Sequence, residues 1–224
     1  MRLHVQRSGA GVPPLVFIHG LGATVATWNG CVERLRDRYE TVAIDLLGHG
    51  ASPVPADPAE YTRDLALADI DEVLASLDSP AVLVGHSLGG YLALAHAATR
   101  QGAVHALVVL NTGPGFRDPD KREAWNARSR RNAHRFGVPA QATDLNLQHD
   151  AVVMERLARI EVPTLVLAGE LDRADYTTSG EYLERKMPHA RLELVPGGEH
   201  NMQESHPSEV AAAIDAFVQS TIAL

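Results

Sequence analysis

Short, almost entirely apolar runs recur along the chain, and they constrain its fold more than any other feature. Five of these runs lie at residues 15–18, 41–44, 81–84, 106–110 and 164–168. Continuous apolar runs of this length are typical of parallel strands that are covered on both faces. A sixth run at 191–195 alternates polar and apolar residues, so we expect it nearer to a sheet edge.

Longer amphipathic patterns separate these runs, at about residues 24–38, 60–78, 88–101, 178–187 and 207–222. Strands that alternate with helices of this length predict right-handed crossovers and an α/β fold with a mostly parallel, doubly wound sheet. One more strand is expected at residues 2–6, before the first apolar run. No linker rich in Pro or Ser divides the chain, so residues 1–224 are predicted to form a single domain.

Residues 113–160 break this alternation, because they separate two strands by far more chain than one helix needs. Within this interval we expect helices at 118–136 and 151–160. Insertions at the exit of a strand are where α/β enzymes place lids and specificity loops. The interval therefore predicts a short helical lid.

The composition excludes several classes of protein. Twenty Lys and Arg against 28 Asp and Glu give a formal charge of −8, which argues against a nucleic-acid partner. The single cysteine, Cys31, rules out an intramolecular disulfide and is expected to be a buried apolar side chain. No run of 18 apolar residues and no secretory leader are found, so we expect no membrane contact and a cytoplasmic location. The histidines lack metal-ligand spacing, and no metal site is expected.

The hexapeptide Gly85-His-Ser-Leu-Gly-Gly90 follows one apolar run directly and opens a helical pattern. A serine in such a G-x-S-x-G pattern sits on a sharp strand-to-helix turn, where only glycine fits two residues before and after it. This predicts Ser87 as a nucleophile, with the backbone N–H of Leu88 placed to stabilise an oxyanion.

An activated serine needs a base and a group that orients the base. Asp172 follows the run at 164–168 and is the preferred acid, while Asp175 and Glu170 stay open as alternatives. Three histidines remain beyond it. His189 precedes the last strand and His206 directly precedes Pro207, whereas His200 follows the strand in a glycine-rich loop. We therefore predict His200 as the base.

A second oxyanion donor is expected from the turn His19-Gly-Leu-Gly22, which ends the first apolar run. The backbone N–H of Leu21 would point toward the same place as that of Leu88. The turn is not a dinucleotide fingerprint, because Val25 occupies the position of the third glycine.

The order Ser87, Asp172, His200 and the motifs around these residues resemble the α/β-hydrolase superfamily. Further matching segments are 45–52, 169–172 and 198–200, so the resemblance spans almost the whole chain. It implies a Ser-His-Asp hydrolase that needs no cofactor, and a purely structural role for Asp45 and His49. The chain departs from the family pattern in leaving room for one strand before residue 15, where two are usual, and in its short lid.

The resemblance favours an enzyme that cleaves a carboxylic ester of a small or medium substrate through an acyl-enzyme. A carbon–carbon bond hydrolase of the meta-cleavage-product type, or a thioesterase, would use the same residues. A ligand-binding receptor built on a hydrolase fold is the alternative outside enzymes. No oligomeric state is predicted.

Residues 117–135 of the predicted lid are basic, with seven Lys or Arg against three Asp or Glu. Trp125 and Phe136 would share one helix face and form an apolar, substrate-binding roof over the pocket. Two interpretations of the charge stay open. The basic residues form a solvated face on an acidic protein, or Arg128 and Arg131 reach the pocket and favour substrates with a carboxylate or phosphate.

Overall fold

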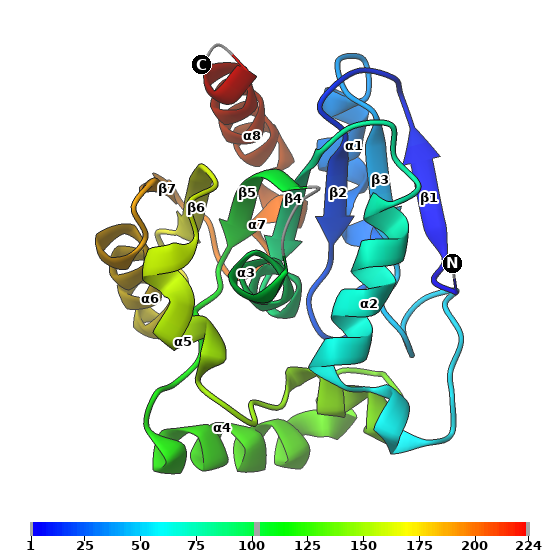
Figure 1. The fold of residues 1–224 in the computed structure, drawn as a ribbon, viewed down its shortest axis with the longest axis vertical. Coiled ribbons are helices and arrows are strands. Elements are labelled where there is room, and N and C mark those ends of the chain that lie inside the picture. Colours follow the sequence, from blue (N-terminus) through cyan, green and yellow to red (C-terminus); the bar gives the residue numbers. More distant parts are fainter. Residues whose placement is uncertain (1, 101–103, 223–224) are drawn as a thin grey trace.

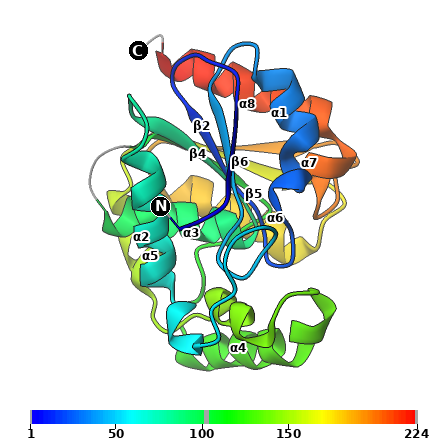
Figure 2. The same cartoon turned by 90° about the vertical axis from the view of Figure 1, so that its right-hand side faces the viewer.

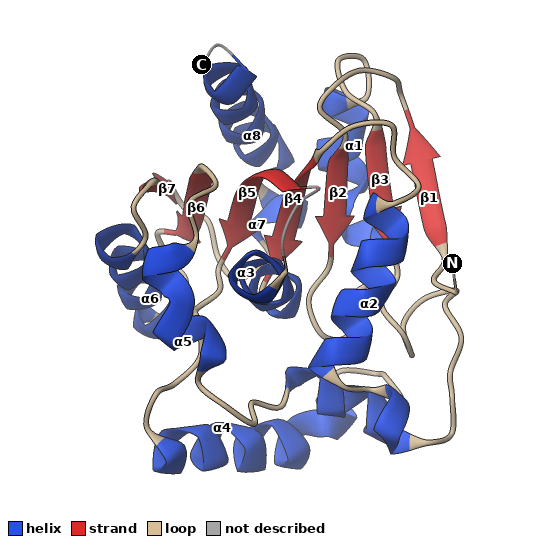
Figure 3. Ribbon diagram, in the orientation of Figure 1, coloured by secondary structure: helices blue, strands red, loops and turns tan. Residues whose placement is uncertain are grey.

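The computed structural model describes residues 2–100 and 104–222, and its centre is one seven-stranded sheet (Figure 3). The strands, with the order β1-β3-β2-β4-β5-β6-β7 in the sheet, are β1 Val5–Ser8, β2 Leu15–Ile18, β3 Thr41–Ile44, β4 Ala81–His86, β5 Val104–Leu110, β6 Thr164–Gly169 and β7 Ala190–Val195. Strand β1 pairs antiparallel with β3, and all other pairs are parallel. The predicted α/β class with a mostly parallel sheet is confirmed.

Every apolar run of the sequence lies within a strand, but the first strand was misplaced. It was expected at 2–6 and occupies Val5–Ser8 instead, because its pairing with β3 runs from Val5 opposite Ile44 to Ser8 opposite Thr41. The alternating strand β7 lies at the sheet edge, as expected.

Helices and 3₁₀ turns connect the strands. Outside the insertion they are the 3₁₀ turns η1 Val25–Trp28 and η2 Pro58–Glu60, with the helices α1 Asn29–Leu35, α2 Arg63–Leu74, α3 Leu88–Thr99, α6 Ala174–Lys186, α7 Met202–Ser205 and α8 Pro207–Ile222. Helix α6 begins four residues before the predicted start, and the short α7 was not predicted. None of the helices that the structure describes has the length and apolarity to cross a membrane.

The sheet separates two apolar cores, because neighbouring side chains on a strand point to opposite faces. Leu15 and Phe17 of β2 pack with α1 and α8 on one face, while Val16 and Ile18 pack with α2 and α3 on the other. Figures 1 and 2 show these helices on the two sides of the sheet. The central strands are buried on both faces, which explains their continuous apolar sequence.

The insertion between β5 and β6 contains five short elements. They are α4 Pro119–Asn132, η3 Ala133–Arg135, η4 Ala140–Asn146, α5 Val152–Arg156 and η5 Leu157–Arg159. The helix predicted at 118–136 thus ends at Asn132, and the one predicted at 151–160 turns into a 3₁₀ turn. In Figure 1, α4 lies at the bottom of the view, apart from the sheet and on the side toward which β2 points. This placement supports the proposal that the insertion acts as a lid.

Candidate active site

Ser87 occupies the sharp turn between β4 and α3. Its φ of 51° and ψ of −111° are sparsely populated for a residue with a side chain. Two hydrogen bonds hold the turn against β5: the Ser87 N–H donates to the Leu110 carbonyl (2.9 Å), and the Thr112 hydroxyl donates to the Ser87 carbonyl (2.7 Å). Hydrogen bonds therefore fix both peptide groups that flank the strained Ser87 Cα.

The glycines on either side of Ser87 have no space for a side chain. A Cβ on Gly85 would lie 2.4 Å from the Gly89 carbonyl oxygen, and one on Gly89 would lie 2.1 Å from that of Ile18. Helix α3 therefore approaches β2 through bare backbone. This close approach is the physical reason for glycine at both positions.

His200 and Asp172 come together at the carboxyl ends of β7 and β6. The His200 Nδ1 lies 2.9 Å from an oxygen of Asp172, whose side chain is only 3% exposed. The other oxygen of Asp172 accepts a hydrogen bond from the Arg173 N–H (2.7 Å). A carboxylate at Nδ1 favours the tautomer with its proton there, which leaves Nε2 free to accept a proton.

The alternative residues have other partners. Asp175 pairs with Arg173 (2.9 Å), and Glu170 accepts from the Gly197 N–H (3.0 Å). His206 bonds to the neighbouring Ser205 hydroxyl (2.8 Å), and the His189 carbonyl accepts from Thr164 at the amino end of β6. Of the acids and histidines weighed from the sequence, Asp172 and His200 are the two that the structure pairs.

Tyr176, which sequence reasoning missed, contacts both ends of this arrangement. Its ring centroid lies 4.6 Å from that of His200, and its hydroxyl is within hydrogen-bonding reach of the Ser87 side chain. Burial, followed by the nearby charge of Asp172, raises the pKa of this hydroxyl. Tyr176 is therefore a neighbour of both Ser87 and His200.

The turn after β2 lies beside the serine. The His19 Nε2 accepts from the Leu46 N–H (3.0 Å), so Nδ1 carries the proton and donates to the Gly20 carbonyl (2.7 Å). This bond fixes the peptide whose N–H belongs to Leu21. A Cβ on Gly20 would lie 3.3 Å from the Ser87 Cβ, so the turn is in contact with the serine. The N–H of Leu88, as the first residue of α3, has no acceptor within that helix.

Asn111 is a second residue that the sequence analysis missed. It has a φ of 46°, and its side-chain nitrogen donates to the carbonyls of Glu199 (3.0 Å) and His200 (2.8 Å). Its side-chain oxygen accepts from the Gly169 N–H (2.9 Å). Asn111 therefore ties residues 196–200, which we call the histidine loop, to the ends of β5 and β6. An asparagine directly after a buried strand was the available signal, because asparagine tolerates positive φ better than most residues.

His86 holds the histidine loop by a hydrogen bond to its backbone. Its Nε2 donates to the His200 carbonyl (2.8 Å), while its Nδ1 has no partner among the described residues and lies against Gly20. Burial, reinforced by the charge of a protonated His200, lowers the pKa of His86 to about 3. His86 is therefore neutral at physiological pH and acts as a fixed donor.

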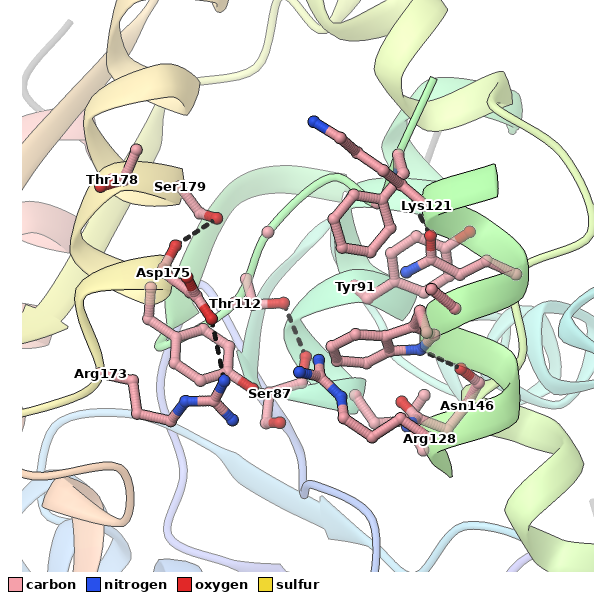
Figure 4. Close-up of a pocket in the computed structure, with 18 of the residues that line it drawn as sticks. Ser87, Tyr91, Thr112, Lys121, Arg128, Asn146, Arg173, Asp175, Thr178 and Ser179 are labelled. Carbon is pink, nitrogen blue, oxygen red and sulfur yellow. Dashed lines mark hydrogen bonds and ion pairs between the residues drawn. The ribbon is translucent and has the colours of Figure 1, made fainter. Parts of the chain in front are cut away.

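A cavity of about 770 Å³ opens beside Ser87 (Figure 4). Its walls include Leu88 and Tyr91 of α3, Tyr176 of α6 and Trp125 of α4. Phe136, expected beside Trp125, is not part of this wall; its backbone lies against Gly22. The reason is the 3₁₀ turn η3, which ends the helical periodicity that would have aligned the two rings.

The structure also shows where Cys31 and Asp45 lie. Cys31 is buried in the core as predicted, and burial raises the pKa of its thiol to about 12. Asp45 accepts from the Val25 and Ala51 N–H groups (2.7 and 2.9 Å), which is a structural role. Within residues 2–100 and 104–222, no cluster of His, Cys, Asp or Glu could hold a metal ion.

Several known proteins are similar to this chain in sequence or in fold. A pimeloyl-[acyl-carrier protein] methyl ester esterase of Xanthomonas campestris is 30% identical over 260 residues, covering 96% of this chain and 98% of the relative. The 2-(acetamidomethylene)succinate hydrolase of Mesorhizobium japonicum is 24% identical, with 97% and 92% covered. The structure of MenH from S. aureus shares the fold, with a TM-score of 0.85, 22% identity and coverage of 97% and 98%.

These relatives are hydrolases or share the fold of this chain, and a model of the alpha/beta hydrolase family matches residues 15–213. That match covers the sheet from β2 onward, the turn at Ser87, the insertion and the histidine loop. The chain is a member of the α/β-hydrolase family.

Proposed function

We propose that this protein hydrolyses carboxylic esters of small or medium size through an acyl-enzyme. The observation that carries the proposal is the strained turn at Ser87, which lines the cavity, together with the His200–Asp172 pair (2.9 Å). Tyr176, another wall residue, lies between them, with its ring centroid 4.6 Å from that of His200. Membership of a hydrolase family and an esterase at 30% identity support it.

In the first half of the reaction, the Ser87 Oγ attacks the ester carbonyl carbon while its proton passes to the His200 Nε2. Asp172 holds the imidazole in the required tautomer and stabilises the imidazolium that forms. The tetrahedral intermediate collapses when the carbon–oxygen bond of the ester breaks. The alcohol leaves with the proton from His200, and the acyl group stays on Ser87.

The negative charge on the intermediate is assigned to the backbone N–H groups of Leu21 and Leu88. Leu88 is at the positive end of α3, and the Leu21 peptide is held by the bond from His19 to the Gly20 carbonyl (2.7 Å). Donors that are fixed before the reaction stabilise the charge without reorganisation, and loss of one costs about 10²-fold or more in kcat.

In the second half, water gives a proton to the His200 Nε2 and attacks the acyl carbon. The carboxylic acid is released, and Ser87 recovers its proton. A thioester or a carbon–carbon substrate would pass through the same acyl-enzyme, so substrate panels decide between these reactions. A receptor would bind ligand without turnover.

The test measures release of p-nitrophenol from p-nitrophenyl butyrate and labelling by a fluorophosphonate. Ser87→Ala should lose about 10⁶-fold in kcat and all labelling, because the nucleophile is gone. Ser208→Ala, on the exposed start of α8, is the matched control and should keep both. Labelling of another residue, or an active Ser87→Ala protein, contradicts the proposal.

The base and the acid are tested by matched pairs. His200→Ala and Asp172→Asn should each abolish most turnover, whereas His206→Ala and Asp175→Asn should retain it. Near-native turnover in Asp172→Asn together with loss in Asp175→Asn would reassign the acid.

A further inference from the structure

Three cationic side chains of α4 line the cavity: Lys121, Arg128 and Arg131. In the part of the chain that the structure describes, no carboxylate pairs with any of the three. Arg130 of the same helix, which is outside the cavity, does pair with Glu123 (3.6 Å). Arg122 of this helix, also outside the cavity, donates to the carbonyls of Phe116 (3.0 Å) and Arg117 (2.7 Å). The three cations that line the cavity therefore have no carboxylate that compensates their charge.

Arg128 occupies a defined position in this group. Its guanidinium lies over the ring of Trp125, 4.8 Å from the centroid, and the Trp125 Nε1 donates to the Asn146 carbonyl (2.9 Å). In Figure 4 its side chain extends from α4 toward the part of the cavity that contains Ser87. Stacking fixes the plane of a guanidinium and leaves its edge N–H groups free for an oxyanion.

The charge of Arg128 affects Tyr176, which lines the cavity together with Ser87. The positive charges of Arg173 and Arg128 each act to lower the pKa of Tyr176, although burial raises it overall. The Tyr176 hydroxyl is itself in reach of Ser87. Ser87, Tyr176 and Arg128 line the same cavity, so one substrate bound there can extend from the serine to Arg128.

The opposite wall does not cancel this charge. Arg173 and Asp175 of that wall pair with each other (2.9 Å), which leaves the three α4 cations in excess. The whole chain carries a formal charge of −8, so the positive cavity is a local feature and not a consequence of overall composition. Overall charge alone would repel an anionic substrate.

We infer that Arg128, Arg131 and Lys121 form a binding site for a carboxylate or phosphate group that the substrate carries away from its scissile ester. This inference rests on the proposed esterase function. Phe116 lies beside Trp125 (5.9 Å between centroids), so an apolar stretch is available along the same wall. The substrate class is therefore an ester whose carbon chain ends in an anion.

The experiment compares three p-nitrophenyl esters of equal length: the adipic acid monoester, its terminal carboxamide and the analogue with a terminal phosphonate. For the wild-type protein, kcat/KM for at least one anionic ester should exceed that for the carboxamide by about 10-fold or more, as expected for a charge-assisted hydrogen bond. The two anionic arms distinguish a carboxylate from a phosphate-like group.

Substitutions on α4 test which side chains cause the preference for anionic esters. Arg128→Gln and Arg131→Gln should each lower the ratio of anionic to neutral kcat/KM by about 10-fold. Lys121→Gln should lower it less, since an ammonium lacks the planar fork of arginine. Arg130→Gln, on the same helix but outside the cavity, should leave the ratio unchanged. A ratio near one in the wild-type protein, or one that survives the Arg128 and Arg131 substitutions, overturns the inference.

A binding measurement separates this inference from the proposed reaction. Adipate should bind the Ser87→Ala protein in isothermal titration calorimetry. The Arg128→Gln substitution in that background should raise the Kd for adipate by about 10-fold. Binding that is equal in both proteins also overturns the inference. If adipate binds as expected but no ester is turned over, the esterase proposal fails while the anion site stands.

Discussion

The turn around Ser87 and the insertion that contains α4 face the same cavity but are held in different ways. At the turn, main chain lies against main chain: a Cβ on Gly89 would reach within 2.1 Å of the Ile18 carbonyl oxygen. In the insertion, side chains make the connections, as where Asn126 bonds both the N–H (2.8 Å) and the carbonyl (2.9 Å) of Gln148.

Under the proposed function, this difference separates the residues that perform the chemistry from those that select the substrate. Backbone packing leaves no room for a side chain at Gly85 or Gly89, so the position of Ser87 is fixed. Side-chain contacts in the insertion can be exchanged one at a time, each at a modest cost in stability. The comparison predicts that equal changes in the two regions will have unequal effects.

The largest effect is expected from adding one methyl group at the turn. Gly89→Ala forces α3 away from β2, because the clash is with backbone, and should lower the free energy of unfolding by about 3 kcal/mol or more. Gly137→Ala in the insertion has nothing within 4 Å of the new Cβ and should cost only the strain of its φ of +65°, about 1–2 kcal/mol. Chemical denaturation of both variants measures the difference.

A smaller effect is expected when a side-chain connection of the insertion is removed. Asn126→Ala leaves the buried N–H and carbonyl of Gln148 without partners, which should cost about 2 kcal/mol in unfolding free energy. Asn132→Ala, which removes a single bond to the Arg128 carbonyl within the helix, is the control and should cost less. Equal losses in the two variants would argue that the Gln148 contact does not hold α4.

The smallest expected effect is a change in how the unfolding free energy depends on pH. It should be seen at histidines beside the serine turn and not at a histidine of the insertion. Burial lowers the pKa of His86 to about 3 and that of His19 to about 4, so the folded protein keeps both neutral. The unfolded chain binds these protons below about pH 6.5, so stability is full above that pH and falls as the pH drops. Each histidine contributes about 1.4 kcal/mol per pH unit to this slope.

His86→Gln should therefore reduce the dependence of unfolding free energy on pH between about 4.5 and 6 by one proton. His134 is exposed on the insertion, and His134→Gln should leave the slope as it is. Denaturation at a series of pH values measures both slopes. An unchanged slope in His86→Gln would show that this histidine is not buried neutral.

The sequence was sufficient where a residue's place follows from its position at a strand end. Ser87, Asp172 and His200 each lie three to five residues after an apolar run. Parallel strands bring their carboxyl ends to one edge of the sheet. Asn111 also follows such a run, but its role depends on a loop almost ninety residues later, for which no local pattern exists.

The insertion was less predictable because its helix has polar residues on most of its surface. With so few apolar positions, the sequence does not determine which side of α4 turns toward the sheet, and both interpretations of its arginines stayed open. Contacts from outside the helix, such as the bond of Trp125 to the Asn146 carbonyl, decide its rotation. Those contacts place Arg128 and Arg131 on the cavity wall and leave Phe136 out of it.

The residues at the end of β5 determine how the insertion could be exchanged for that of another family member. Leu110, Asn111 and Thr112 bond to the serine turn, to β6 and to the histidine loop, and the insertion begins directly after them. The three residues hold the serine turn and the histidine loop together at the point where the insertion starts. We expect that residues 113–160 could be transplanted from another member of the family without realigning Ser87 and His200, so that new selectivity arises by exchange of a segment and leaves the chemistry intact.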